Sequence, residues 1–554
     1  VSTRKYFLLP TAAALAVVTL VLWVAVRPSL RSMGRTGRGS WTAGAGSWSE
    51  SGGPVDGASV AKAAKRVDTL LETAWTAESI EPAREAEPLQ LLRRLALALV
   101  GTPPSLEEIR QFEAGESPGR LEEWTTRYIA DPRFAEYFAA RLGDVFVDPV
   151  AEDLKPHQRE RFRKWLGAEI QRGRPYSEIV REMVAARGGF SDQPATTFVS
   201  LELSGDEEAA QRLAARTSRA FLGQRIDCAQ CHDHPFADWK QSQFESLAAY
   251  YGQVRFRSAR VQDTRPRPFI IEDVLKQEVR TVEPAVPFDS QWVPERKHLR
   301  VELAVWLTHP KNRRFRRAIA NRVWGLMLGR PFIAPVDDLP DPGPLDEPDV
   351  LDLLASDLND NGDDLRRLIR VIVGTRAFRL DSRHDEMNDE MAVERLESAW
   401  AVFPVTDLGP HQMIRAMQQA AVVQTLRVDD SNTFIAIRRY EGRSRFVDQY
   451  GIAGDAEEAQ ASTIPHTVER LSGRETQRYG DAGLFTAAGR IAAMSSDPHT
   501  CLENCYLACL SRRPTAGEAS HFLPRMTGKL KRRVTTVKDI YWGIFNSAEF
   551  CRNH

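Results

Sequence analysis

Cysteine is scarce in this chain, with 6 residues among 554, and this scarcity excludes a disulfide-dense scaffold. An excess of charge of one sign is also missing, because 74 Lys and Arg residues stand against 75 Asp and Glu residues. The whole chain is therefore neither a dedicated polyanion binder nor an acidic solvating protein. Its composition, with 42% hydrophobic and 27% charged residues, is that of an ordinary globular protein.

Short catalytic signatures are missing as well. The sequence contains no Ser-His-Asp order, no phosphate-binding loop and no H-E-x-x-H pattern. It also lacks a repeat with a period of about 20–50 residues, which excludes solenoids and propellers. No catalytic constellation can be named, so the sequence leaves the question of an enzyme open.

One apolar run, Tyr6–Val26, is long enough to cross a bilayer as a helix of about 20 residues. Arg27-Pro28 stands where a signal peptide would carry its small-residue cleavage site, which disfavours cleavage. We therefore expect an uncleaved transmembrane signal anchor over residues 1–28, with a cleaved signal peptide as the runner-up. Residues 29–60 are rich in Gly, Ser and Arg and predict a flexible tether.

Beyond the tether the pattern is helical nearly everywhere. Ser105 precedes Glu108 by three residues, which predicts a capping box, and Asp131 and Asp349 each precede a helical run. Strand-like stretches are few, and Pro194–Leu203 is one of them.

The pattern predicts a mainly α fold. The best division is into two helical domains, residues 61–262 and 297–554, joined by a poorly periodic linker over 263–296. The second strand-like stretch, Val254–Arg260, lies near the end of the first domain.

The motif that carries chemistry is Cys228-Ala229-Gln230-Cys231-His232, which has the C-x-x-C-H spacing of c-type haem attachment. Two thiols at this spacing can add to the two haem vinyl groups, and the imidazole that follows is then held beneath the iron. We predict haem c on Cys228 and Cys231 with His232 as the proximal iron ligand. His234 is expected to orient the loop or to serve as an alternative metal ligand.

Three other interpretations of the motif stay open. A zinc ion could use the two thiols and a nearby histidine, although the second ligand pair of a tetrahedral site is missing. A redox dithiol would normally occur beside a βαβ unit, which the sequence does not predict here. The last interpretation is that the two cysteines are small buried side chains at a helix end, without chemistry. The distal iron ligand is unknown; its candidates are His157, His309, His411, Met327 and Met494, or an open position.

The segment around this motif, Phe221–Gly252, resembles the planctomycete cytochrome c-like proteins, which are bacterial envelope proteins with two paired domains of unknown function. Leu91–Phe112 is similar to the opening of their first domain, and Glu302–Leu339, Leu365–Leu380 and Leu510–Thr515 are similar to parts of the second. The resemblance implies an envelope protein with haem at Cys228, Cys231 and His232, and it implies no reaction. Longer members often carry an amino-terminal cytochrome module, in place of which this chain has its anchor and tether.

Two further clusters are interpreted as structural. Cys501, Cys505 and Cys509 share one helix stripe, and we expect them to face a core as small apolar side chains. The basic run Lys311–Arg322 lacks a row of aromatic residues on which bases could stack. We therefore expect a solvated face paired with the acidic stretch Asp337–Asp364, and no nucleic-acid partner.

We therefore expect a membrane-tethered c-type haem protein with a redox or electron-transfer role. It would cross the bacterial inner membrane once, with its body in the periplasm and an unknown redox or envelope protein as partner. The basic residues behind the anchor weakly favour a cytoplasmic body, but covalent haem is attached outside the cytoplasm. The alternative is a structural or partner-binding envelope module whose Cys/His cluster is a zinc or purely structural site.

Overall fold

The computed structural model describes residues 56–115, 119–147, 156–200, 208–233, 238–264, 268–273, 278–295, 298–426, 474–483 and 486–554. All of them belong to one compact unit, Gly52–His554. The predicted anchor and residues 29–55 of the predicted tether lie outside the described residues. The end of the tether prediction is wrong, because Gly57 begins a helix that buries Val60. Within these ranges, no helix combines the length and the apolar character needed to cross a membrane.

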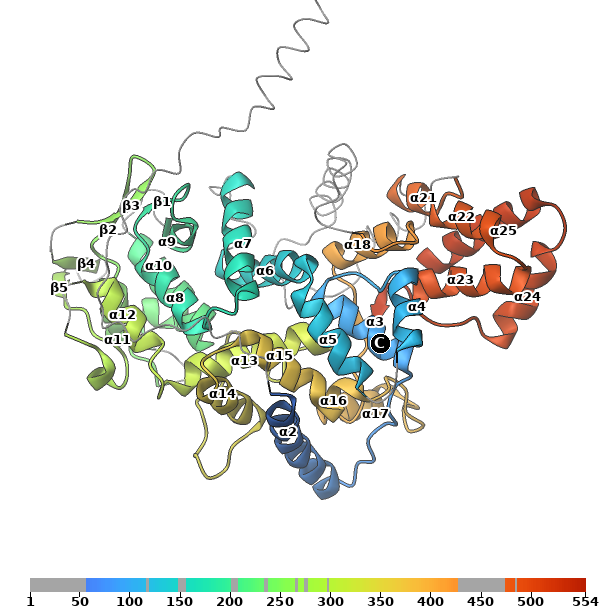
Figure 1. The fold of residues 1–554 in the computed structure, drawn as a ribbon. Helices are drawn as coiled ribbons and strands as arrows, with labels where there is room; N and C mark the ends of the chain where they lie inside the picture. The colour runs from blue at the N-terminus through green and yellow to red at the C-terminus, as the bar shows by residue number, and fades with distance from the viewer. Residues whose placement is uncertain are drawn as a thin grey trace, which may run out of the picture. The chain divides into compact units, whose positions relative to one another are not determined.

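The described part is mainly helical, as predicted (Figure 1). The helices that precede residue 250 are α2 (Gly57–Ala77), α3 (Pro88–Leu99), α4 (Leu106–Ala114), α5 (Arg120–Ala130), α6 (Pro132–Phe146), α7 (Pro156–Gln171), α8 (Tyr176–Ala185), α9 (Thr197–Ser200), α10 (Ala209–Thr217) and α11 (Gln241–Ala249). The later helices are α12 (Leu299–Leu307), α13 (Arg313–Leu328), α14 (Val350–Asp360), α15 (Leu365–Gly374), α16 (Arg376–Arg379), α17 (Glu390–Ser398), α18 (Pro410–Ala420), α21 (Arg474–Gly480), α22 (Ala487–Met494), α23 (Pro498–Leu510), α24 (Ala516–Met526) and α25 (Leu530–Phe545).

Short elements connect these helices. Three are 3-10 turns, η1 (Pro194–Thr196), η4 (Asp227–Gln230) and η5 (Ser290–Trp292), and one is a π-helical turn, η3 (Ser218–Leu222). The strands are β1 (Gly188–Gly189), β2 (Val254–Arg257), β3 (Arg260–Asp263), β4 (Phe269–Asp273), β5 (Glu278–Val282), β6 (Thr406–Asp407) and β7 (Arg552–Asn553). All pairings are antiparallel: β1-β3-β2 form one sheet, and β4-β5 and β6-β7 form two-stranded ladders.

The helix caps predicted at Ser105 and Asp131 are confirmed. Ser105 Oγ accepts from the Glu108 amide at 3.0 Å and Glu108 Oε2 accepts from the Ser105 amide at 2.8 Å, which confirms the capping box. Asp131 caps α6 with a 2.8 Å hydrogen bond from the Arg133 amide. The strand predicted at Pro194–Leu203 is wrong, because this buried segment forms η1 and α9 as far as it is described. β-Branched and aromatic residues are typical of strands, but they also occupy buried positions in helices, and this explains the error.

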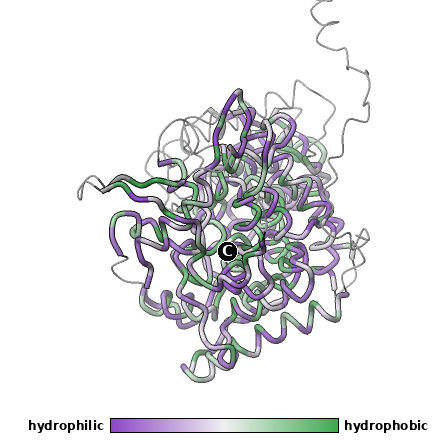
Figure 2. The backbone as a smooth tube through the Cα atoms, turned by 90° about the vertical axis from the view of Figure 1, so that its left-hand side faces the viewer, coloured by the Kyte–Doolittle hydropathy of each residue, from purple (hydrophilic) through white to green (hydrophobic). Residues whose placement is uncertain are grey.

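Apolar side chains form two clusters. The larger one draws on residues from Val60 to Phe403 and also contains Leu507 of α23, whereas the smaller one lies among α18 and α21–α25 and contains Leu97 of α3. Each cluster thus includes a leucine from a helix of the other, so the two cores meet along α3 and α23. Apolar and polar segments alternate along the helices in Figure 2, as expected for helices with one buried face.

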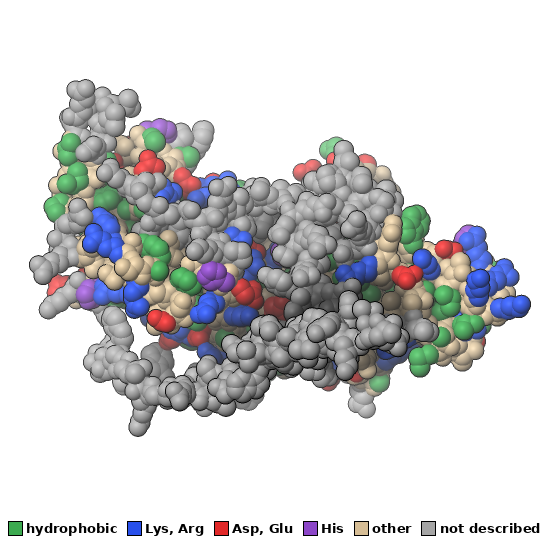
Figure 3. Space-filling model, turned by 90° about the horizontal axis from the view of Figure 1, so that it is seen from above, with side chains coloured by type: hydrophobic (Ala, Val, Ile, Leu, Met, Phe, Trp, Pro, Cys, Tyr) green, Lys and Arg blue, Asp and Glu red, His purple; other side chains and the backbone are tan. Residues whose placement is uncertain are grey.

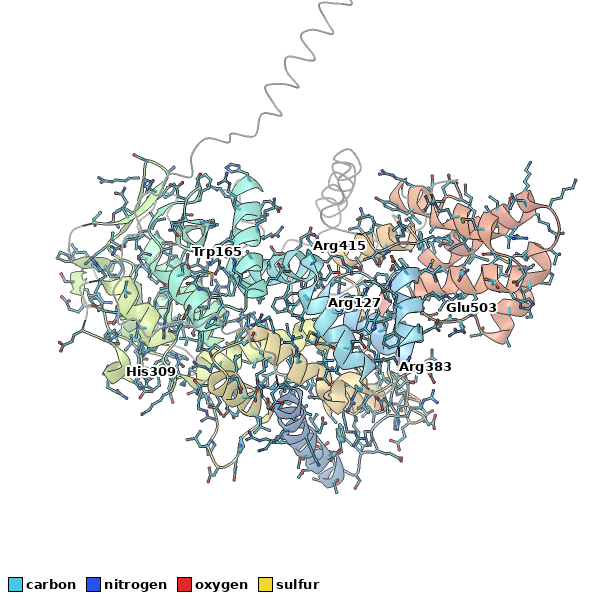
Figure 4. All side chains as sticks on the ribbon, in the orientation of Figure 1. Arg127, Trp165, His309, Arg383, Arg415 and Glu503 are labelled. Atoms are coloured by element: carbon cyan, nitrogen blue, oxygen red, sulfur yellow. The ribbon has the colours of Figure 1, made fainter. Side chains whose placement is uncertain are left out.

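Ion pairs also connect helices that are distant in sequence. Arg415 of α18 pairs with Glu136 of α6 at 3.1 Å, and Glu503 of α23 pairs with Arg110 of α4 at 3.6 Å (Figure 4). The stretch 263–296, predicted as a linker, contains the β4-β5 hairpin and η5. The two predicted helical regions are therefore joined by a shared core and by side-chain contacts.

The basic run on α13 pairs with the acidic stretch, as predicted, but it is not a solvated face. Arg316 binds Asp363 through two hydrogen bonds of 2.7 and 2.9 Å, and Arg317 binds Asp349 through two of 2.7 and 2.8 Å. Only 5% of the Arg316 side chain and 2% of the Arg317 side chain are exposed. The reason is that α13 packs against α3, α14, α15 and η3, so its arginines are enclosed.

Two further arginines are buried on α3. Arg94 donates to the carbonyl oxygens of Leu380 at 2.6 Å and His554 at 2.8 Å, and its guanidinium lies 3.8 Å above the Phe403 ring. Burial lowers the pKa of Arg94 to about 9. The neighbouring Arg93 donates to the carbonyl of Cys509 at 3.2 Å. The helix α3 therefore binds backbone groups from the last helices of the chain.

The cysteine stripe on α23 faces the smaller core, as predicted. Cys501, Cys505 and Cys509 are fully buried free thiols. Burial raises the pKa of the Cys509 thiol, which keeps it protonated and unreactive.

The buried pair between Arg316 and Asp363 yields a stability prediction. Asp363→Asn keeps a side chain that tolerates the left-handed conformation of this residue (φ 57°) but leaves the Arg316 charge without its partner. We expect the variant to lose about 3–5 kcal/mol of unfolding free energy in urea denaturation. The matched control is Asp360→Asn at an exposed carboxylate, which should change stability by less than about 0.5 kcal/mol. Equal losses in both variants would contradict the importance of the buried pair.

Stability should also depend on pH through His554. Burial, with the nearby charge of Arg93, lowers the pKa of His554 from 6.5 to about 4, although Glu549 opposes the change. Because the unfolded chain takes up this proton at higher pH than the folded chain, the stabilisation is complete above pH 6.5 and is lost as the pH falls toward 4. His554→Gln should flatten the unfolding free energy across this window, whereas His499→Gln, at an exposed position, should not.

Candidate functional site

The C-x-x-C-H motif lies on the short turn η4 and the residues that follow it. The Ala229 amide donates to the Ile226 carbonyl at 2.9 Å, and both of these side chains are buried. Cys228 and Cys231 are exposed free thiols on the opposite side of this turn. The turn therefore fixes its apolar residues in the core and leaves both thiols accessible.

The ring of His232 is exposed, and its Nδ1 atom lies 2.7 Å from the carbonyl oxygen of Asp233. A carbonyl oxygen can only accept, so Nδ1–H donates to it, and Nε2 is the ring nitrogen left for another partner. A backbone acceptor on one ring nitrogen is the usual way in which a protein orients a histidine that binds metal through the other nitrogen.

Contacts with the start of α11 hold the residues after the motif. Asp233 Oδ1 accepts from the Gln241 amide at 2.9 Å, and Lys240 Nζ lies 3.2 Å from Asp233 Oδ2. These hydrogen bonds, that of the Gln241 amide first, lower the pKa of Asp233. Gln241 Nε2 also donates to the Gln230 carbonyl at 3.3 Å. His234 lies outside the described residues, so its expected role stays a prediction.

The segment before the motif is held by a loop from the second predicted domain. Gln224 Nε2 donates to the Leu339 carbonyl at 2.5 Å, and Arg225 Nε donates to Asp337 Oδ1 at 2.8 Å. The Leu339 amide donates to the Gly223 carbonyl at 2.7 Å. Gly223 has φ 63°, and a Cβ atom there would lie 3.0 Å from Leu339 Cδ1, so this close approach requires glycine.

A buried arginine of α13 completes this support. Arg322 donates to the carbonyls of Ala220 at 2.7 Å and Arg219 at 3.0 Å, which lie in η3 just before the motif. Arg219 in turn lies 3.5 Å from Asp227, the residue that precedes Cys228. Burial raises the pKa of Asp227. The motif thus rests on a platform that both predicted domains build.

The candidates for a distal ligand are placed elsewhere. His309 stacks on Trp292 with ring centroids 4.7 Å apart (His309 is labelled in Figure 4), and His157 lies 5.5 Å from the Phe190 ring. Met327 is fully buried in α13, and Met494 is 81% exposed at the end of α22. Among the described residues, no hydrogen bond or ring contact joins these four side chains to the motif. His411 lies on α18.

The donor set fits covalent haem attachment, because it consists of two accessible thiols and an imidazole with a free Nε2. For the part of the chain that the structure describes, no three His, Cys, Asp or Glu side chains are grouped so that they could hold a metal ion. Sequence reasoning found the motif but missed its supports, Gly223, Gln224, Arg322 and Leu339.

Two family models match the chain on either side of residue 263. Residues 66–256 match a model described as "Protein of unknown function (DUF1549)", and residues 299–441 match one described as "Protein of unknown function (DUF1553)". Searches of curated proteins and of solved structures found no match. The chain therefore contains the paired domains of unknown function that its sequence suggested, and the motif turn lies within the first of them while resting on residues of the second.

Proposed function

We propose that this protein binds haem c covalently through Cys228 and Cys231, with His232 as the axial ligand, and that it acts in electron transfer. The observation that carries the proposal is the motif turn, which exposes both thiols while a backbone carbonyl holds His232 Nδ1 and leaves Nε2 free. When bound, haem would supply one-electron chemistry at its iron. The chain's own residues hold and orient the group.

The residues that support the motif turn would hold its backbone in place around the haem. Leu339 and Arg322 bind the backbone just before the motif, and Gln241 binds the backbone of Gln230 within it. A fixed backbone keeps the imidazole and both sulfur atoms in one arrangement, which limits reorganisation around an axial ligand.

The proposed location follows from the chemistry of attachment. Covalent haem is attached outside the cytoplasm, so we place the body in the periplasm of a bacterial cell. In this arrangement residues 1–28 form a single-pass anchor, a tether follows as far as the start of α2 at Gly57, and the helical body comes after it. The partner would be another redox or envelope protein.

A second candidate is a structural or partner-binding envelope module. It is favoured by the position of the motif turn, which joins the two matched regions through Gln224, Arg225 and Leu339. In that case the Cys/His cluster would stabilise this junction, with or without zinc.

Covalent attachment can be tested by producing the full chain together with c-type haem maturation machinery. We expect haem staining of the denatured protein and a sharp Soret band, because only thioether-linked haem survives denaturation. The Cys228→Ala/Cys231→Ala variant should lose the stain completely. The matched control, Cys501→Ala/Cys505→Ala, also removes two thiols, and it should keep the stain because those thiols are buried. Persistent covalent haem in the first variant would refute the assignment.

The role of His232 can be separated from attachment. His232→Ala should keep covalent haem but shift the Soret and visible absorption bands, because the axial nitrogen is removed while both thiols remain. His499→Ala changes an exposed histidine of α23 and should leave the spectrum unaltered. If the wild-type protein carries no haem and instead releases one zinc ion when His232 is changed, the scaffold function replaces the redox function.

A further inference from the structure

The turn between α24 and α25 carries a cluster of exposed cations. Arg525 lies in the last turn of α24, Lys529 is the N-cap residue of α25, and Lys531 and Arg532 lie in the first turn of α25. All four side chains are exposed, and none of them pairs with an acidic side chain of the described residues. Figure 3 shows Lys and Arg side chains gathered at the end of the described body that α24 and α25 form.

Two large apolar side chains lie within this cluster. Leu530 is 53% exposed at the first position of α25, and Met494 is 81% exposed at the last position of α22. Arg533 joins the two, because it donates to the carbonyls of Ala492 at 3.4 Å and Ser495 at 3.0 Å. The end of α22 is therefore fixed against the first turn of α25. We call Met494, Arg525, Lys529, Leu530, Lys531 and Arg532 the basic patch.

The acidic residue that follows α22 in the chain caps the next helix. Asp497 accepts from the amides of His499 at 2.8 Å and Thr500 at 3.0 Å and so caps α23.

We propose that the basic patch is a contact surface for a bilayer that contains anionic phospholipid. Four exposed cations, which have no acidic partner among the described residues, match the charge of phosphate headgroups. Each Lys or Arg near such a surface raises partitioning roughly fivefold. Leu530, which lies between Lys529 and Lys531, and Met494, at the end of α22 that Arg533 binds, are exposed and can enter the boundary between headgroups and acyl chains. The inference is independent of haem, since it uses no residue of the motif.

The apolar members of the patch favour a membrane over nucleic acid. Surfaces that bind single-stranded nucleic acid combine cations with rows of aromatic side chains on which the bases stack. The basic patch contains only aliphatic apolar residues, which would stay in water on a nucleic acid but are buried on a bilayer. We therefore expect the patch to bind a bilayer and not a nucleic acid.

The test measures amide hydrogen exchange of the full chain reconstituted with lipid vesicles. Vesicles of phosphatidylcholine alone are compared with vesicles that contain about 30% phosphatidylglycerol, an anionic lipid. We expect the amides of residues 527–533 to exchange several-fold more slowly on the anionic vesicles only. About 0.5 M sodium chloride should reverse the slowing, because it screens charges beyond a few ångströms.

Two triple variants separate the patch from general charge effects. Lys529→Glu/Lys531→Glu/Arg532→Glu should abolish the slowing. Lys62→Glu/Lys65→Glu/Arg66→Glu changes three exposed cations of α2 by the same charge and should keep it. If the first variant melts earlier than wild type, Lys529→Gln/Lys531→Gln/Arg532→Gln replaces it. Equal slowing on neutral vesicles, no slowing on anionic vesicles, or slowing with soluble single-stranded DNA instead would overturn the proposal.

Discussion

The structure depends on guanidinium groups that are enclosed in its interior and that bind partners far away in sequence. On α13, Arg316 and Arg317 bind carboxylates near the two ends of α14, and Arg322 binds the backbone before the motif. On α3, Arg94 binds carbonyls of residues 380 and 554. A buried charge is costly unless it is paired and hydrogen-bonded, so each arginine specifies one arrangement of the elements around it. Loss of a partner would leave a charge that water cannot reach.

These contacts explain which parts of the fold the sequence could predict. Caps such as Ser105 with Glu108 are formed by residues within one helical turn, and local spacing is enough to find them. The burial of Arg316 depends instead on α3, α14 and α15, which pack around α13 from distant parts of the chain. A run of basic residues carries no mark that distinguishes an enclosed helix from a solvated one, so the pairing was predicted and the burial was not.

The candidate site shows the same division. The spacing of Cys228, Cys231 and His232 is local and could be recognised from the sequence alone. The acceptor of His232 is also local, since it is the next carbonyl along the chain. The platform is not, because Leu339 and Arg322 reach the motif only when the two matched regions are packed together. Apolar and basic residues of an ordinary helix or loop give no sign of this role.

The order of these segments along the chain also sets an order in time. During synthesis Cys228 and Cys231 leave the ribosome well before Arg322 and Leu339, which later hold the backbone beside them. In that interval the backbone before the motif lacks the contacts that Arg322 and Leu339 later provide, and both thiols are open to modification. Once the second region has packed, the turn has a single backbone conformation. Any enzyme that needs the motif extended must therefore act before the second half of the body folds.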